Sequence, residues 1–121
     1  MPSTVTFNVK GQLFCTAEVT PLTSDVLERA SAALRKEHGK KFIPGEMDFD
    51  ELGEFNAECV RLVTESLTMA DSTRPILGKP PEAVRRFFRE TRNEALVKGI
   101  TREAKRLADA EKTELEVTSG N

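Results

Sequence analysis

The chain has 121 residues with 18 basic and 20 acidic side chains, giving a formal net charge of −2. This length fits one domain with a modest core, and the charge balance excludes nucleic-acid binding through bulk positive charge. The two cysteines form no CxxC motif, so together with the single histidine they exclude a four-ligand zinc site of the usual kind.

The first predicted element is a β-hairpin over residues 4–19. Val5, Phe7 and Val9 alternate with polar residues, which is the period of a strand. Gly11 can adopt the positive φ of a tight turn, and the run "LFCTAEV" is typical of a second strand. Since an isolated two-stranded hairpin is marginally stable, we expect it to pack on helices or to pair with another chain.

Two amphipathic helices are predicted next, over about residues 24–38 and 48–70. The first begins with the capping residues Ser24 and Asp25 and ends at Gly39. In the second, Asp48 and Glu51 have the spacing of a capping box. A mostly apolar stripe recurs along the second helix at helical spacing, and it comprises Leu52, Phe55, Cys59, Leu62, Val63, Ser66 and Ala70.

The run "DSTRPILGKPP" contains three prolines and ends the helical pattern. A third helix is predicted over residues 81–98, with Pro81 in its first turn, and a fourth over residues 101–110 after an interruption at Gly99. Residues 111–121 are predicted to form a flexible tail. The expected fold is therefore mainly α, with one small helical domain over residues 1–110 and an N-terminal β-hairpin. Its predicted core comprises Phe55, Leu62, Val63, Val84, Phe87, Phe88 and Leu107.

The sequence contains no recognisable catalytic or metal-binding motif. The run "DFDELGE" begins like a calcium-binding loop, but Leu52 and Cys59 occupy positions that need acidic ligands. The run "GKKFIPGE" lacks the spacing of a phosphate-binding loop, and His38 has no orienting partner that would make it a general base. We therefore expect a protein that is not an enzyme and has no cofactor or metal. Without a run of 18 apolar residues or a recognisable signal peptide, we also expect a soluble, intracellular protein with no membrane partner.

Acidic and basic residues are separated along the chain. Six acids and no base lie from Glu46 to Glu58, whereas ten bases and four acids lie from Arg74 to Arg106. The candidate interaction residues are therefore Arg85, Arg89 and Arg92 in the third predicted helix and Asp50, Glu51, Glu54 and Glu58 in the second. Three interpretations stay open: these surfaces meet water, they pair within or between chains, or the arginines bind nucleic acid. The absence of tyrosine and tryptophan disfavours the last of these.

Two loops carry pairs of large apolar residues, Phe42–Ile43 and Ile76–Leu77. Such pairs either dock on the core of their own domain or stand exposed and bind a partner. Ile76 and Leu77 are for this reason further candidate partner-binding residues.

The chain combines an extended start with a glycine turn, "TFNVKGQLFCTAEV", with the run "PLTSDVLERA", an acidic amphipathic helix and a charged helical C-terminal region. This organisation resembles the tail assembly chaperones of long-tailed bacteriophages. The resemblance covers most of the chain, but it lies in the organisation and in no residue motif, so no functional residue is carried over.

The resemblance implies a non-enzymatic, mainly helical protein that forms homo-oligomers and binds the tape measure and tail tube proteins. It further implies a protein that acts in the host cytoplasm and is absent from the mature virion. Members of the family often have a longer product, made by programmed ribosomal frameshifting. A helix-in-groove contact with a long helical partner would suit such a role. The alternative interpretation is a small basic-helix protein that binds nucleic acid or acts as a regulator.

Overall fold

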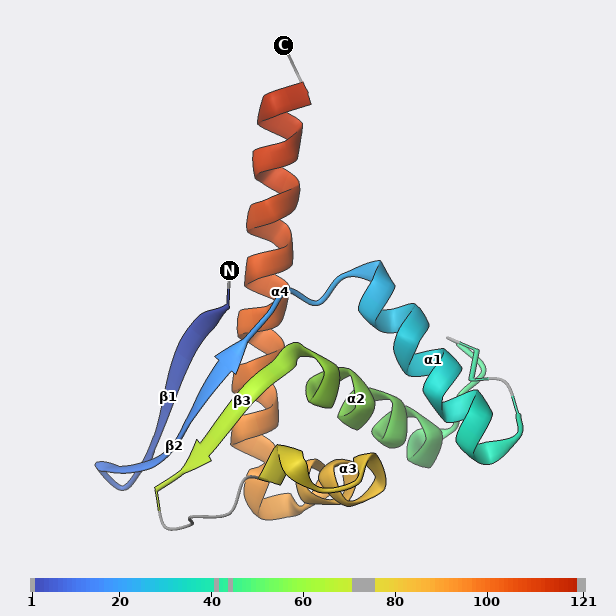
Figure 1. Cartoon of the computed structure of the whole chain (residues 1–121), viewed down its shortest axis with the longest axis horizontal. Helices are drawn as coiled ribbons and strands as arrows, with labels where there is room; N and C mark the ends of the chain where they lie inside the picture. Colours follow the sequence, from blue (N-terminus) through green and yellow to red (C-terminus); the bar gives the residue numbers. More distant parts are fainter. Residues whose placement is uncertain (1, 41, 44, 71–75, 120–121) are drawn as a thin grey trace.

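The computed structural model describes residues 2–40, 42, 43, 45–70 and 76–119, and the described side chains exclude Val9 and residues 112–119. Within this part of the chain there are four α-helices and one three-stranded antiparallel sheet (Figure 1). The fold is therefore mixed α/β rather than mainly α. The predicted N-terminal hairpin is confirmed. A third strand extends it into a sheet, and the four helices follow in the chain.

The hairpin consists of β1 (Ser3–Val9) and β2 (Gln12–Val19), which pair antiparallel. Lys10 and Gly11 connect them with positive φ angles of 53° and 78°. Two successive positive φ values match the right-handed twist of the strands, which explains the glycine at this turn. The strand order β1-β2-β3 places β2 in the middle of the sheet.

The third strand corrects the predicted helix over residues 48–70. The helix α2 (Phe49–Val63) is only fifteen residues long, and β3 (Thr64–Met69) follows without a loop. The Thr64 hydroxyl donates to the Val60 carbonyl at 2.6 Å and closes the last turn of α2. β3 then pairs with the free edge of β2, where Ala17 faces Leu67. Pairing with a distant strand overrides the local helical pattern at this point.

The first two helices begin and end largely where the sequence indicates. Helix α1 (Ser24–His38) has the predicted bounds, although its N-cap is Thr23, and Gly39 closes it with a φ of 72°. The capping box of α2 is confirmed, since the Asp48 carboxylate accepts from the Glu51 N–H at 2.8 Å and the Glu51 carboxylate accepts from the Asp48 N–H at 3.3 Å.

The C-terminal helices differ from the predicted ranges 81–98 and 101–110. The structure has α3 (Pro81–Arg89) and α4 (Glu94–Ser119), with short 3₁₀ turns at η1 (Ile76–Gly78) and η2 (Thr91–Asn93). The chain leaves the helix at Glu90, whose ψ is 135°, and the Asn93 side-chain amide donates to the Phe87 carbonyl at 2.8 Å. The backbone of residues 111–119 continues α4 where a flexible tail is predicted, and residues 71–75 and 120–121 lie outside the described residues.

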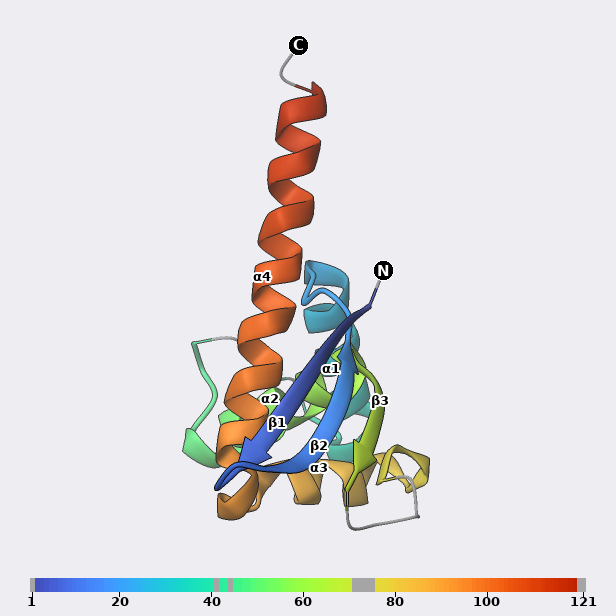
Figure 2. The same ribbon diagram turned by 90° about the vertical axis from the view of Figure 1, so that its left-hand side faces the viewer.

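Gly99 lies inside α4 and does not interrupt the helix. A glycine is needed at this position because the sheet approaches the helix closely there. A Cβ atom at Gly99 would lie 2.3 Å from Cε1 of Phe7 on β1. The glycine therefore lets α4 cross the sheet at close range. Figures 1 and 2 show α4 lying beside the β1–β2 hairpin with its first half and extending beyond the body with its second half.

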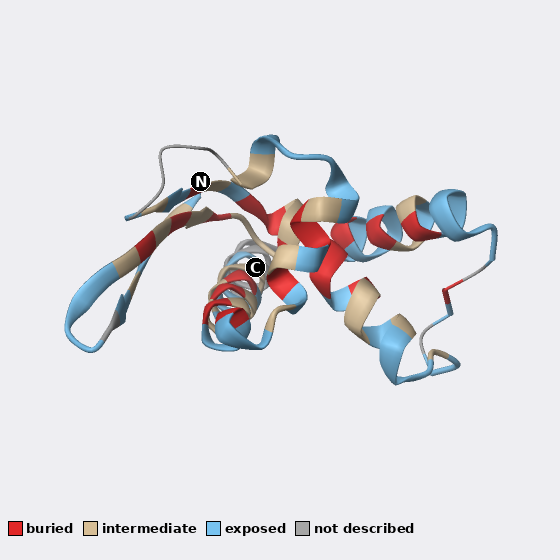
Figure 3. Ribbon diagram, turned by 90° about the horizontal axis from the view of Figure 1, so that it is seen from below, coloured by how far each residue is buried: buried red, intermediate tan, exposed pale blue. Residues whose placement is uncertain are grey.

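The core has two clusters of buried side chains. The main cluster joins the sheet, α2, α3 and α4 through residues such as Val19, Val63, Phe88 and Ile100. The second cluster lies between α1 and α2 and comprises Ala30, Leu34, Phe42, Phe55 and Cys59. Buried positions accordingly concentrate where the helices meet the sheet, while the β1–β2 turn is exposed (Figure 3).

The predicted core is confirmed for four of its residues. Val63, Val84 and Phe88 are buried in the main cluster, whereas Phe55 is buried in the second. Leu62, Phe87 and Leu107 are only half-buried.

Candidate functional site

Arg85 is the most unusual residue of the predicted arginine set, because only 2% of its side chain is exposed. Its Nη1 donates to Glu58 at 3.0 Å and its Nε donates to Glu54 at 3.3 Å. Its Nη2 donates to Glu37 at the end of α1. One guanidinium group therefore connects α1, α2 and α3.

Glu58 is fully buried, so of the open interpretations the one in which its carboxylate meets water is excluded. Arg61 donates to both of its carboxylate oxygens at 2.7 Å, and Arg85 approaches from the other side. A carboxylate tolerates burial when charged donors satisfy it from several directions. Helical spacing indicates the face on which Glu58 lies, but it does not show that another helix covers that face.

The remaining predicted charged residues lie nearer the surface. Arg89 donates to Glu54 at 2.7 Å and to Asp50 at 2.8 Å. Arg92 contacts Glu90 on its own segment and has 75% of its side chain exposed. Glu51 lies 2.8 Å from Lys40. Among the open interpretations, pairing within one chain is therefore the one seen for Arg85 and Arg89.

The electrostatics of this network keep its central carboxylate ionised. Burial would raise the pKa of Glu58, but hydrogen bonds from Arg61 and Arg85 outweigh that effect and place the pKa below its ordinary value. An acid/base catalyst working near neutral pH needs a shift in the opposite direction. The ion network formed by Glu37, Glu54, Glu58, Arg61 and Arg85 therefore acts as a link between helices.

The two cysteines are buried and unpaired with each other. Burial raises the pKa of both thiols to about 11, with the charge of Glu58 adding to the effect at Cys59. Both are thus thiols and weak nucleophiles at neutral pH. In the described part of the chain, no three His, Cys, Asp or Glu side chains are grouped so that they could hold a metal ion. None of the helices searched there is long and apolar enough to cross a membrane.

The predicted apolar loop residues contact the core of their own chain. Ile76 and Leu77 are half-buried and pack against the main cluster. Phe42 is buried in the second cluster, whereas Ile43 is exposed. Of the two readings, docking on the core is therefore the one seen for Ile76, Leu77 and Phe42.

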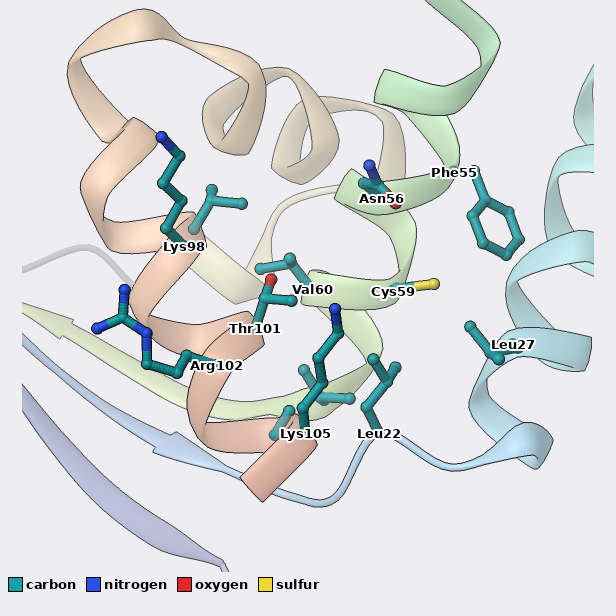
Figure 4. Close-up of a pocket in the computed structure, with 13 residues that line it drawn as sticks. Leu22, Leu27, Phe55, Asn56, Cys59, Val60, Lys98, Thr101, Arg102 and Lys105 are labelled. Carbon is teal, nitrogen blue, oxygen red and sulfur yellow. The ribbon is translucent and has the colours of Figure 1, made fainter. Parts of the chain in front are cut away.

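A groove that the sequence reasoning missed lies between α1 and α4, with α2 as its floor (Figure 4). Its volume is about 710 Å³. Phe55 and Cys59 line it on the side of α1, and Val60 lines it on the side of α4. The linker before α1 closes one end, since the Leu22 N–H donates to the Ala104 carbonyl at 3.0 Å.

The rim of this groove differs sharply from its floor. Lys98, Arg102 and Lys105 stand exposed along α4 at positions i, i+4 and i+7, which share one face of a helix. The opposite wall on α1 carries Leu27, which is 41% exposed. The regular spacing of the three bases is the sequence signal that could have indicated this rim.

A second, smaller hollow of about 310 Å³ continues the groove toward the start of α2. Asn56 and Val97 line both spaces. Phe49 and Leu52 border the second hollow and are 91% and 46% exposed. The two hollows thus follow α2 one after the other, with exposed apolar side chains at the start of the helix and the exposed Asn56 between the hollows.

Comparison with protein-family models, curated proteins and solved structures gives no match to this chain.

Proposed function

We propose that the protein is a non-enzymatic phage tail assembly chaperone that self-associates and binds the tape measure and tail tube proteins during tail assembly. It would act in the host cytoplasm and be absent from the mature virion. The observation that carries the proposal is the groove along α2, which has an apolar floor and a charged rim.

A groove of this kind suits a protein partner better than a small polar substrate. Its floor on α2 is mostly apolar, with Phe55, Val60 and Val63, and the Asn56 amide is its one exposed polar group, so it offers few contacts for orienting a small polar molecule. An amphipathic helix, in contrast, can place its apolar face on such a floor. A tape measure protein is a long helical chain whose apolar stripes must be shielded before assembly, so it fits this mode of binding.

The row of bases on α4 supports a second candidate, a small basic-helix protein that binds nucleic acid. Lys98, Arg102 and Lys105 could contact successive phosphates, and such binding would fall steeply as salt rises. The apolar floor beside these bases favours a protein partner. Salt-dependent binding to random duplex DNA would favour this alternative.

Co-expression tests the chaperone proposal. The chain and the tape measure protein of the same genome are produced together and separately, and the soluble fraction of the tape measure protein is measured. We expect a higher soluble fraction and co-purification in the presence of the chain. A tape measure protein whose solubility and elution are unchanged would contradict the proposal.

A further inference from the structure

We propose that the groove between α1 and α4 receives one amphipathic helix of a partner protein, apolar on one face and acidic along one flank. The inference deepens the proposed function and rests on it, because it names the binding site and the chemistry of the partner segment. Four observations carry it: the floor, the walls, the length and the charge of the groove.

The walls of the groove stand on either side of α2, so a helix placed between them would lie along α2. Helices α1 and α4 both pack on α2, at opposite sides of the groove. A helix lying between them would contact Leu27 on one wall, Thr101 on the other and Asn56 beneath. The volume of about 710 Å³ is enough for several apolar side chains from one helix face.

The combined length of the two hollows also fits a helix. The two hollows together follow α2 from Phe49 to Val63. Fifteen helical residues span about 22 Å at 1.5 Å per residue. A partner helix of about four turns would therefore be in contact along its whole length.

The rim sets the charge of the partner. Lys98 lies 3.1 Å from Glu94 on its own helix. Within the described part of the chain, no carboxylate lies within 4.0 Å of Arg102 or Lys105. Both bases are exposed beside the apolar floor, so a helix with acidic residues on the flank facing α4 would complement them.

The acidic end of α4 from a second copy fits this groove less well. Residues 109–119 contain four acids, which match the rim, but their only large apolar residues are Leu115 and Val117. An occupant of the floor needs an apolar residue on each turn, at spacings of three and four. The observations therefore favour a segment of a different protein.

The absence of tryptophan and tyrosine from this chain permits a direct binding assay. The probe is a synthetic helical peptide of about 16 residues with leucines at helical spacing, one tryptophan on the apolar face and glutamates on the flank. Its tryptophan emission is followed while the full-length chain is added. We expect a blue shift as the indole enters the groove, and weaker binding of a matched peptide with lysines in place of the glutamates.

Two variants and their controls locate the site. Leu27 lies outside both core clusters, so Leu27→Ser should weaken peptide binding about tenfold while the fold is retained. Leu13→Ser on the hairpin is its matched control, since Leu13 is also exposed and lies away from the groove. The double variant Arg102→Glu with Lys105→Glu should lose the preference for the acidic peptide, whereas Lys36→Glu with Lys79→Glu should keep it. Circular dichroism checks the fold of each variant.

Three results would overturn the inference: no blue shift at concentrations up to about 1 mM, equal affinity for the two peptides, or equal affinity of Leu27→Ser and Leu13→Ser. A dimer of the free chain that blocks the peptide and that Leu27→Ser abolishes would also overturn it, in favour of a second copy as occupant. The co-expression test separates the two proposals. If Leu27→Ser still raises the soluble fraction of the tape measure protein, the chaperone proposal stands and the groove inference fails.

Discussion

Three arginines that look equivalent in the sequence have three different environments. Arg85 is buried among carboxylates from two helices, Arg89 bridges two acids of α2 at the surface, and Arg92 is exposed beside Glu90. The free energy that each contributes must differ accordingly, because exposed ion pairs are weak and a broken buried pair is costly.

Replacement of Arg85 tests this difference. Arg85→Met should lower the free energy of unfolding by about 3–5 kcal/mol, since Glu58 then stays buried with one fewer partner. Arg92→Met should change it by less than about 0.5 kcal/mol. Urea denaturation of both variants measures the difference. The double variant Glu58→Leu with Arg85→Met should lose less than the two single losses together, and strict additivity would show that the two charges do not interact.

Acid should weaken the fold through Glu58. Its pKa in the folded protein lies below the ordinary value of 4.5, so the folded state binds this proton less readily than the unfolded state. The stabilisation from Glu58 is therefore complete above about pH 4.5 and is lost as the pH falls through the folded-state pKa. Denaturation of the wild type and of Glu58→Gln between about pH 6 and pH 3 should give a steeper decline for the wild type. If the free energies of unfolding of the wild type and of Glu58→Gln fall equally with pH, other groups cause the acid destabilisation.

At the scale of elements, the two glycines that lie inside helices, Gly53 and Gly99, have neighbours of different kinds where a Cβ atom would be. The space beside Gly99 is filled by the Phe7 ring of β1, which is partly buried in the main cluster. The space beside Gly53 is filled by the guanidinium end of Arg89, 2.9 Å from the position of a Cβ atom. The first neighbour is held by packing, and the second is the mobile end of a long side chain.

Alanine at these two positions should therefore have opposite effects. Gly53→Ala gains up to about 1 kcal/mol of helix propensity, and Arg89 can shift to accommodate it. Gly99→Ala gains the same propensity but forces Phe7 and the sheet away from α4, with a net loss of about 1–3 kcal/mol. Thermal unfolding of the two variants side by side measures both effects. A stabilised Gly99→Ala variant would show that Phe7 moves aside at little cost.

The sequence predicted correctly those features that depend on residues close to one another in the chain. The hairpin turn at Lys10–Gly11, the bounds of α1 and the capping box at Asp48 all depend on neighbours in the chain. The strand β3 and the unbroken helix at Gly99 depend on contacts with segments far away, with β2 and with Phe7 respectively. Such contacts are invisible to a periodicity analysis.

At the scale of the whole molecule, contacts between distant segments also decide which parts of the candidate site could be predicted from the sequence. The separation of charge between residues 46–58 and 74–106 made pairing of the acidic and basic helices one of three interpretations, and it left open whether such pairing lies within one chain. The groove could not be predicted, because it exists only where α1 and α4 stand apart on α2. Its rim was present in the sequence as three regularly spaced bases.

The proposed self-association should depend on the exposed apolar start of α2, because the acids Asp50, Glu54 and Glu58 are already paired within the chain. Phe49 is 91% exposed, so Phe49→Ser should shift the protein toward the monomer without changing its unfolding. Sedimentation velocity over a concentration series measures the shift, with Leu13→Ser as the control. A wild type that stays monomeric throughout would remove self-association from the proposed function.

The link that Arg85 makes between helices has a consequence for synthesis on the ribosome. Glu58 is translated 27 residues before Arg85, and the α4 residues that complete the main cluster follow later still. Until those residues emerge, a nascent chain that has formed α2 holds a carboxylate without its buried partner and a sheet without its covering helix. The domain can therefore settle into its native state only near the end of translation, and a ribosome that stalls before residue 85 leaves a product that cannot fold.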